Sequence, residues 1–254
     1  MARQQDLKKI LAKLDSGQLD LLLEMATCMS RKIKQTIDEE SDILTEEFLA
    51  NFSNRLIIHH ATHEEKFKKK SFEFAFCSAS RSAGRTAKIV SDPTNPGADV
   101  IVDNVKFSLK TEASAGIRKQ RITISKLMEA RWIRDCKTKL DFARRIKDRV
   151  VGHLSKYERI LTLRAFKVGD ASVRYDLVEI PIELLLRMQR LASKDFGKKT
   201  KAGGSGANVK IGRSKVFRVV LDGSVEKVTI SGLDVDSCFT HGSWEVPILT
   251  DREL

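Results

Sequence analysis

Two residues with chemically useful side chains, Asp99 and Lys110, flank a short segment that is predicted to form a β-hairpin. Residues 100–102 are β-branched, and residues 105–110 can return beside them as a second strand. The pair Asp103-Asn104 between them tolerates positive φ, which favours a two-residue turn. Such a hairpin brings a carboxylate close to an ammonium group. The carboxylate can bind a metal ion, and the lysine can hold an attacking water or a phosphate.

The alternation of side chains divides this hairpin into an apolar and a polar face. Directly opposed residues share a face, so Asp99 is expected opposite Ser108. The apolar face holds Val100, Val102, Val105, Phe107 and Leu109. The polar face holds Asp99, Ile101, Lys106, Ser108, Lys110 and Glu112. The first set is suited to a core and the second to chemistry.

An Asp on one strand and a Lys on the next, after a Pro-containing loop, resemble the PD-(D/E)xK nuclease core. That resemblance implies that Asp99 binds a divalent cation, Mg²⁺, with the Leu109 carbonyl as a further ligand, while Lys110 orients the nucleophile. A second acid is expected at position 108, where this chain has Ser. Glu73 or Glu112 could replace it, and Glu73 is preferred for the metal.

Each replacement acid also has a structural interpretation. Glu73 lies between aromatic residues and is either a solvent-facing helix residue or a carboxylate held in a cleft, where it needs a cation or hydrogen bonds. Glu112 could be a surface charge at a strand end. His59, His60 and His63 have spacings that suit a metal, but no acid or Cys completes a set, so we expect structural roles for them. His241 could be a general base of a nuclease, but a lone His near the C-terminus favours a structural role.

The charge balance of the 254-residue chain favours polyanionic partners. Lys and Arg number 46 against 34 Asp and Glu, which gives a net charge of +12 and a pI near 9.6. Four scattered cysteines form no zinc or disulfide pattern, and no apolar run is long enough for a membrane span or a signal peptide. We therefore expect reduced thiols and a cytoplasmic location.

Basic residues flank the hairpin on both sides and recur in a later glycine-rich segment, and we predict that they follow a phosphate backbone. The predicted DNA contacts are Arg81, Arg85, Lys88, Arg118, Lys119, Arg121, Lys198, Lys199 and Lys201. The segment 194–206 has no periodicity and could be a basic loop that orders on DNA or a plain disordered loop.

Hydrophobic periodicity predicts an α/β fold with a mixed central β-sheet flanked by helices, a helical N-terminal region and a β-rich C-terminal part. Further hairpins are expected around Gly169-Asp170 and Asp222-Gly223. Helices are expected over 5–37, with a break at Ser16-Gly17, and over 46–56, 125–151 and 182–192. A further helix is expected to start at a capping box formed by Thr62 and Glu65 and to run through Phe76. A loop is expected over 78–97. We expect one nuclease domain over 1–254, with a helical region over 1–56, a catalytic core over 57–185, and DNA-recognition or dimer elements over 186–254.

Several blocks, in order along the chain, resemble the SmaI-type restriction endonucleases. The blocks are Arg55-Leu56-Ile57 with His59-His60, Phe72-Glu73 with Ala75-Phe76, Thr94-Asn95-Pro96-Gly97 with Asp99, Leu109-Lys110-Thr111-Glu112-Ala113, Tyr157-Glu158-Arg159-Ile160 and Leu177-Val178-Glu179-Ile180-Pro181. They span roughly residues 50–185, and the tail from Ala192 resembles the family poorly.

This resemblance implies a type II restriction endonuclease of the restriction-endonuclease-like fold, which needs Mg²⁺ and acts as a homodimer on a short palindrome in double-stranded DNA. It also implies a cognate DNA methyltransferase as genetic partner, a GC-rich target such as CCCGGG, and a small non-acidic residue at the place of Ser108. Two other functions stay open from the residues alone. One is a non-catalytic DNA-binding protein on a decayed nuclease core, and the other is a repair-type nickase.

Overall fold

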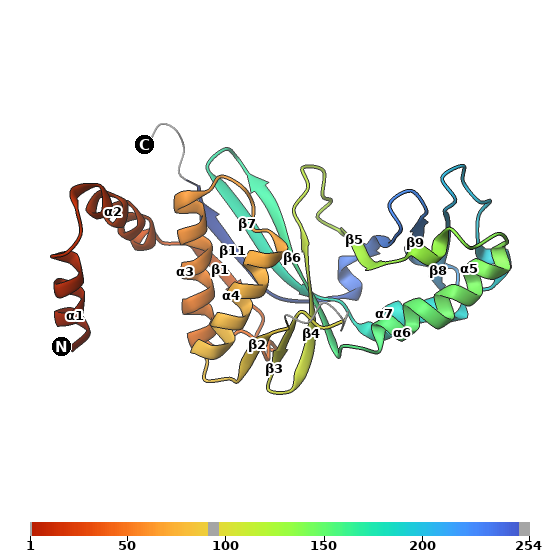
Figure 1. Ribbon diagram of the computed structural model, residues 1–254, viewed down its shortest axis with the longest axis horizontal. Coiled ribbons are helices and arrows are strands. Elements are labelled where there is room, and N and C mark those ends of the chain that lie inside the picture. The colour runs from red at the N-terminus through yellow and green to blue at the C-terminus, as the bar shows by residue number, and fades with distance from the viewer. Residues whose placement is uncertain (1, 91–96, 249–254) are drawn as a thin grey trace.

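The computed structural model describes residues 2–90 and 97–248. Figure 1 shows an elongated molecule with a seven-stranded β-sheet at its centre, a four-stranded β-sheet at one end and two projecting helices at the other. The helices are α1 (Ala2–Leu11), α2 (Ser16–Ser30), α3 (Glu46–Thr62), α4 (Lys69–Ser82), α5 (Lys139–Arg145), α6 (Val151–Leu154) and α7 (Ile182–Leu186).

The strands belong to two sheets. They are β1 (Lys34–Ile37), β2 (Ala87–Ile89), β3 (Val100–Val102), β4 (Val105–Glu112), β5 (Arg121–Glu129), β6 (Arg159–Val168), β7 (Ser172–Glu179), β8 (Ser205–Ile211), β9 (Ser214–Asp222), β10 (Lys227–Asp234) and β11 (Phe239–Pro247). The larger sheet has the order β1-β11-β7-β6-β4-β3-β2, and the smaller has the order β5-β10-β9-β8. Only the β4–β6 pair is parallel among these described strands, so the larger sheet is mixed.

Helices α3 and α4 cover one face of the seven-stranded sheet (Figure 1). An aromatic core lies between these helices and the sheet. Phe52 is fully buried and packs against Trp244 of β11, with ring centroids 5.1 Å apart. Phe76 of α4 contacts Phe107 of β4 at 5.3 Å. The apolar face of the predicted hairpin therefore rests on α4, and its polar face is turned away from this core.

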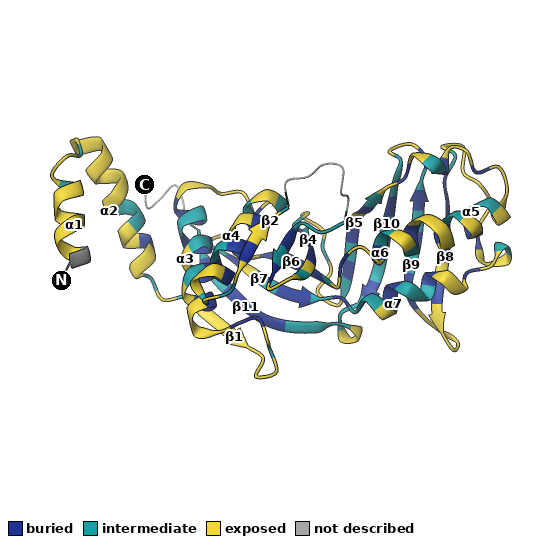
Figure 2. Ribbon diagram, turned by 60° about the horizontal axis from the view of Figure 1, so that its bottom comes forward, coloured by how far each residue is buried: buried dark blue, intermediate teal, exposed yellow. Residues whose placement is uncertain are grey.

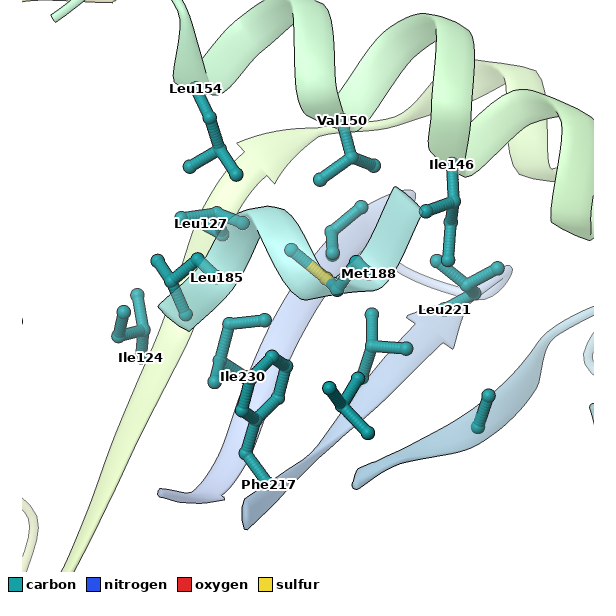
Figure 3. Close-up of a cluster of buried hydrophobic side chains, with 14 of the residues drawn as sticks. Ile124, Leu127, Ile146, Val150, Leu154, Leu185, Met188, Phe217, Leu221 and Ile230 are labelled. Carbon is teal, nitrogen blue, oxygen red and sulfur yellow. The ribbon is translucent and has the colours of Figure 1, made fainter. Parts of the chain in front are cut away.

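A second core lies between the four-stranded sheet and the helices α5 to α7 (Figure 3). Ile146, Val150 and Leu154 descend from one helical segment onto strand residues such as Leu127 and Ile230. Residues 146–150 form a π-helical turn between α5 and α6. Figure 2 shows burial concentrated in the two sheets, whereas α1 and α2 are exposed along most of their length.

The hairpin that carries the candidate chemistry forms as predicted. Val100 pairs with Phe107, Ile101 with Lys106 and Val102 with Val105. Asp103 and Asn104 have φ of 47° and 69°, as a two-residue turn between right-twisted strands requires. The hairpins β6–β7 and β9–β10 and the α/β class are also confirmed.

The predicted start of the fourth helix is wrong. Thr62 ends α3 and does not cap a new helix, and α4 begins after Lys68 without a side-chain cap. The expected loop over 78–97 is also wrong in part, because residues 78–82 continue α4 and residues 87–89 form β2. Residues 91–96 of that loop lie outside the described part of the chain.

Strand pairing overrides local helical pattern at two other places. Residues 34–37 form the edge strand β1, which pairs with β11, although the periodicity predicted a helix to residue 37. Residues 121–129 form β5, which pairs with β10, so the predicted helix over 125–151 exists only in its second part. The helix predicted over 182–192 is shorter, because α7 passes into a 3₁₀ turn at residues 187–190. Across residues 2–90 and 97–248, no helix has the length and apolar character needed to cross a membrane.

Candidate active site

Asp99 is fixed at the entrance to β3 by the neighbouring strand. Its Oδ2 accepts hydrogen bonds from the Leu109 amide at 2.7 Å and from the Ser108 hydroxyl at 3.3 Å. The Asp99 amide donates in turn to the Phe107 carbonyl at 2.8 Å. Ser108, which stands where an acid was expected, is fully buried. Its hydroxyl helps to orient the Asp99 carboxylate through this hydrogen bond. These bonds leave one side of the carboxylate for a cation.

A lysine that sequence reasoning missed lies between the two candidate metal-binding acids. The Lys69 ammonium group is 2.7 Å from Asp99 Oδ1 and 3.4 Å from Glu73 Oε1. Glu73 is only 3% exposed, and its other oxygen accepts from Lys70 at 3.1 Å. Burial lowers the pKa of Lys69, but the hydrogen bonds and charges of Asp99 and Glu73 together outweigh that effect, and the net pKa is raised. Asp99 and Glu73 thus converge on one positive charge.

Lys110 lies beside this cluster on β4. Burial lowers the pKa of Lys110 to about 8, and the Asp99 carboxylate opposes that shift. The charge of Lys69 lowers the Lys110 pKa further. Lys110 is consequently a partly buried amine whose charge changes close to neutral pH, which is a common property of groups that handle protons.

A cavity of about 970 Å³ opens over Asp99 and Lys110, between the end of the hairpin and β5. Its basic lining residues are Lys69, Lys110, Lys126, Arg149 and Lys156, and its acidic ones are Asp99, Glu129 and Asp148. The π-helical turn over residues 146–150 contributes two of these side chains, and such turns recur at functional sites. The excess of basic groups suits an anionic substrate.

Two polar groups near this cavity are buried without a hydrogen-bond partner among the residues that the structure describes, the Tyr157 hydroxyl and Nε2 of His153. The two rings are in edge contact with centroids 5.5 Å apart. Burial, and then the charge of Lys110, lower the pKa of His153 to about 4, so its imidazole is neutral at physiological pH. Burial also raises the pKa of Tyr157, with a further contribution from Asp99.

The donor set at Asp99 fits a magnesium ion. In the described part of the chain no three His, Cys, Asp or Glu side chains form a ready metal cluster. Mg²⁺ usually takes only one or two protein carboxylates and completes its shell with water and substrate phosphates. Asp99 and Glu73 already share one cation, Lys69, so their carboxylates are placed for a positive charge.

Glu112 is engaged elsewhere. Its Oε2 accepts from Arg164 Nε at 2.7 Å, and its Oε1 accepts from the Thr123 amide at 2.8 Å. Arg164 also donates to the carbonyls of Arg118, Lys119 and Arg121. Glu112 does project to the same face as Lys110, as predicted, but it lines a neighbouring cavity of about 380 Å³. Between the two candidate acids, the geometry favours Glu73 for the metal.

The basic residues before the hairpin lie near its turn, at the opposite end from Asp99. Arg85 Nε pairs with Asp103 at 2.7 Å, and Arg81 Nε donates to the Ala87 carbonyl at 2.7 Å. Lys88 is exposed on β2, the edge strand, opposite Ile101. These residues border the sheet edge and not the cavity.

The later basic residues divide into two groups. Arg118 and Arg121 line the smaller cavity, which shares Thr111 with the larger one, and Lys119 is exposed beside them. Lys198, Lys199 and Lys201 lie near β8, the strand of the small sheet most distant from β5. Lys199 donates to the Cys136 carbonyl at 2.6 Å. The structure therefore brings only the first group close to the candidate site.

The histidines that suggested a metal have structural contacts. His59 and His63 stack with centroids 5.0 Å apart, and His59 contacts the Glu65 carbonyl. The buried His60 shares a hydrogen bond with the Tyr175 hydroxyl at 2.7 Å. His241 lies between Ser41 and Glu179. All four cysteines are free thiols.

Sequence reasoning could have found Lys69 but not the other missing cavity residues. Lys69 and Glu73 are four residues apart on one helix, a spacing at which side chains meet. Lys126, Arg149, Lys156 and His153 come from strands and helices whose predicted form was wrong or whose placement depends on distant pairing.

Comparisons with known proteins agree with the resemblance and extend it. The family "SmaI: Type II site-specific deoxyribonuclease" matches residues 7–246. The type II restriction enzyme SmaI of Serratia marcescens is 33% identical over 252 residues, which cover 96% of this chain and 98% of that enzyme. No solved structure matches at a significant level. The C-terminal part, expected to resemble the family poorly, is included in both matches. This chain belongs to the SmaI family of type II site-specific deoxyribonucleases.

Proposed function

We propose that this enzyme uses Mg²⁺ to hydrolyse both strands of double-stranded DNA at a short palindrome, leaving 5′-phosphate and 3′-hydroxyl ends. The observation that carries the proposal is a cavity of basic character lined by Asp99 and Lys110, with Glu73 linked to Asp99 through Lys69. A phosphodiester is held in such a cavity by its charge, and a carboxylate-bound cation can polarise it.

Asp99, Glu73 and the Leu109 carbonyl are the groups that would hold Mg²⁺. When bound, the ion supplies Lewis-acid polarisation of the scissile phosphate and a more acidic water. Hydrogen bonds from the Leu109 amide and the Ser108 hydroxyl keep Asp99 in one orientation, which lowers the entropic cost of binding a cation.

Lys110 has the second role. Its amine is close to Asp99, so it can hydrogen-bond the attacking water and compensate the charge that develops on the phosphate. Because its pKa is lowered toward 8, a modest fraction of the amine is neutral near pH 7 and can take up a proton from that water. Lys69 bridges the two carboxylates and keeps them aligned in the free enzyme.

Recognition of a palindrome requires two active sites related by symmetry, so we propose a homodimer. Resemblance to the family suggests a GC-rich target such as CCCGGG, a cognate DNA methyltransferase as genetic partner, and a cytoplasmic location. Among the predicted DNA contacts, Arg85 and Lys88 border the hairpin, whereas Arg118, Lys119 and Arg121 lie beside the second cavity. Arginines in such places commonly contact phosphates or guanine edges.

The test is incubation of the purified protein with unmethylated plasmid and genomic DNA, with Mg²⁺ and with EDTA, followed by sequencing of the ends. Discrete fragments that form only with Mg²⁺ would support the proposal and identify the target. Asp99→Asn should remove cleavage at every Mg²⁺ concentration. Nicks in one strand only would favour a nickase, and DNA that is bound equally in both conditions but never cut would favour the decayed nuclease core.

A further inference from the structure

The net positive charge of the chain is concentrated in one segment, residues 184–221. This segment holds ten Lys and Arg residues and one acid, Asp195, whereas the rest of the chain holds 36 Lys and Arg residues and 33 acids. It therefore carries nine of the twelve net positive charges. It runs from α7 through two 3₁₀ turns to β8 and β9, near the end of the molecule opposite α1 (Figure 2). A surface of such charge favours a polyanionic partner.

Four of these cations line a hollow at the edge of the small sheet, which we call the edge pocket. It has a volume of about 390 Å³, and its charged lining residues are Arg187, Arg190, Lys194 and Lys210 against Asp195. Lys210 belongs to β8, the outermost strand of the sheet. The other three cations belong to the two 3₁₀ turns. Segments that are separate in the sequence thus bring their positive charges to one place.

The first 3₁₀ turn directs its arginines outward because its apolar residues are held in the core. Side chains three residues apart lie on the same side of a 3₁₀ helix, so Arg187 and Arg190 share one side of the turn. Met188 and Leu191 share another side and are buried. Figure 3 shows Met188 in the core beneath the π-helical turn over residues 146–150, which also lines the catalytic cavity. The edge pocket and the catalytic cavity are therefore joined through one packed core.

No ion pair in the described part of the chain engages the four cations of the edge pocket. For comparison, Arg121 of β5 pairs with Asp234 of β10 at 2.9 Å. The one acid of the edge pocket, Asp195, accepts a hydrogen bond from the Ala192 amide at 2.8 Å. Cations that lie together without counterions repel one another, so a bound anion would relieve that repulsion.

Protection of the sheet edge explains only part of this charge. Lysines on an edge strand prevent one sheet from pairing with another, and Lys210 suits that role. The cations of the 3₁₀ turns are not on a strand, so they cannot serve it. Arg190, Lys194 and Lys210 are exposed, and Arg187 is half-buried. An extended polyanion can contact exposed cations from outside, whereas a small anion would need an enclosed site.

We propose that the edge pocket binds backbone phosphates of duplex DNA outside the cleavage site. The inference rests on the proposed function, which brings a duplex to the catalytic cavity. β5 borders that cavity and β8 is three strands away, which is about 14 Å at the usual strand spacing. That distance corresponds to about four base pairs of duplex DNA. Contacts of this kind add affinity and fix the position of the duplex without reading its bases.

The test is binding of a duplex of roughly 30 base pairs to the full-length chain in EDTA, measured by fluorescence anisotropy over a range of salt concentrations. The neutral variant Arg190→Gln with Lys194→Gln and Lys210→Gln should raise Kd at least about tenfold. It should also reduce the slope of log Kd against log salt concentration by roughly three, because each lost phosphate contact removes about one. The charge-conserving variant Arg190→Lys with Lys194→Arg and Lys210→Arg should bind like wild type, and a loss equal to that of the neutral variant would contradict a phosphate site.

The matched control removes the same amount of charge at the other end of the molecule. Lys8→Gln with Lys9→Gln and Lys13→Gln changes three exposed residues on or beside α1 (Figure 1). Its salt slope should stay close to that of wild type, and the urea midpoints of all variants should agree. Equal salt slopes for the neutral variant and this control would overturn the inference.

Cleavage measurements separate failure of this inference from failure of the proposed function. On plasmid DNA with Mg²⁺, the neutral variant should raise KM at least about tenfold and leave kcat within about twofold, because the edge pocket does not touch the reacting phosphate. A fall in kcat of about tenfold would place the edge pocket at the catalytic centre and overturn the inference. DNA binding that depends on the edge pocket, in a protein that never cuts DNA, would refute the proposed chemistry alone. Cleavage of DNA by wild type, together with a neutral variant that binds like the control, would refute the edge pocket alone.

Discussion

The substitution Glu112→Gln should lower the free energy of unfolding without affecting the metal site. Glu112 is 6% exposed and Arg164 is 1% exposed, and their charged groups are 2.7 Å apart. Breaking a buried ion pair of this kind costs about 3–5 kcal/mol, because the remaining charge is left without its counterion. Glutamine can still accept one hydrogen bond, so we expect about 3 kcal/mol, a large part of a typical stability of about 5–15 kcal/mol.

The assay is urea unfolding followed by tryptophan fluorescence, since Trp244 is fully buried in the core. Glu73→Gln is the matched comparison, because Glu73 is also buried but its partners Lys69 and Lys70 are 43% and 88% exposed. That variant should change stability by less than about 1 kcal/mol and lose cleavage. The reasoning would be refuted if Glu112→Gln kept wild-type stability and lost cleavage, since Glu112 would then act as the metal ligand.

Three further predictions concern single groups. Burial lowers the pKa of His60 to about 4, below its unfolded value near 6.5, so the unfolded chain binds more protons than the folded chain between these pH values. His60 should therefore contribute roughly 2 kcal/mol to the loss of stability from pH 8 to pH 5, and His60→Gln should remove that contribution in urea titrations while the similar contribution of His153 remains. Tyr157→Phe should change stability by less than about 1 kcal/mol, because the hydroxyl has no partner in the described residues, and a loss above about 2 kcal/mol in the same assay would disprove that. Lys69→Ala should reduce the Mg²⁺ concentration for half-maximal cleavage by roughly tenfold, because Lys69 competes for both carboxylates. Loss of cleavage at every Mg²⁺ concentration would assign Lys69 a direct role instead.

Local sequence signals predicted the hairpins and failed where pairing is distant. The Asp103-Asn104 turn and the flanking alternation contain all the information needed for β3 and β4. By contrast, β5 is defined by its pairing with β10, about a hundred residues later, and β1 is defined by β11 near the end of the chain. A helical periodicity in such segments is overruled by partners that a local window does not include.

The same distinction applies to the candidate site. Asp99 and Lys110 belong to one hairpin, so their proximity follows from its register. The strand face on which Glu112 lies was also predictable from the hairpin. Its ion pair with Arg164 was not, because Arg164 is on β6, whose parallel pairing with β4 a local pattern does not predict. The cavity residues of β5 and of the segment 146–156 join the site only when the second sheet is placed beside the first.

The most direct measurement is single-turnover cleavage by Lys110→Ala, with DNA binding measured on the same preparation by gel shift. If Lys110 holds the attacking water at the Asp99 site, cleavage should fall at least about 1,000-fold while DNA binding and the urea midpoint stay close to wild type. Full activity in Lys110→Ala would contradict the assignment of this hairpin as the catalytic centre.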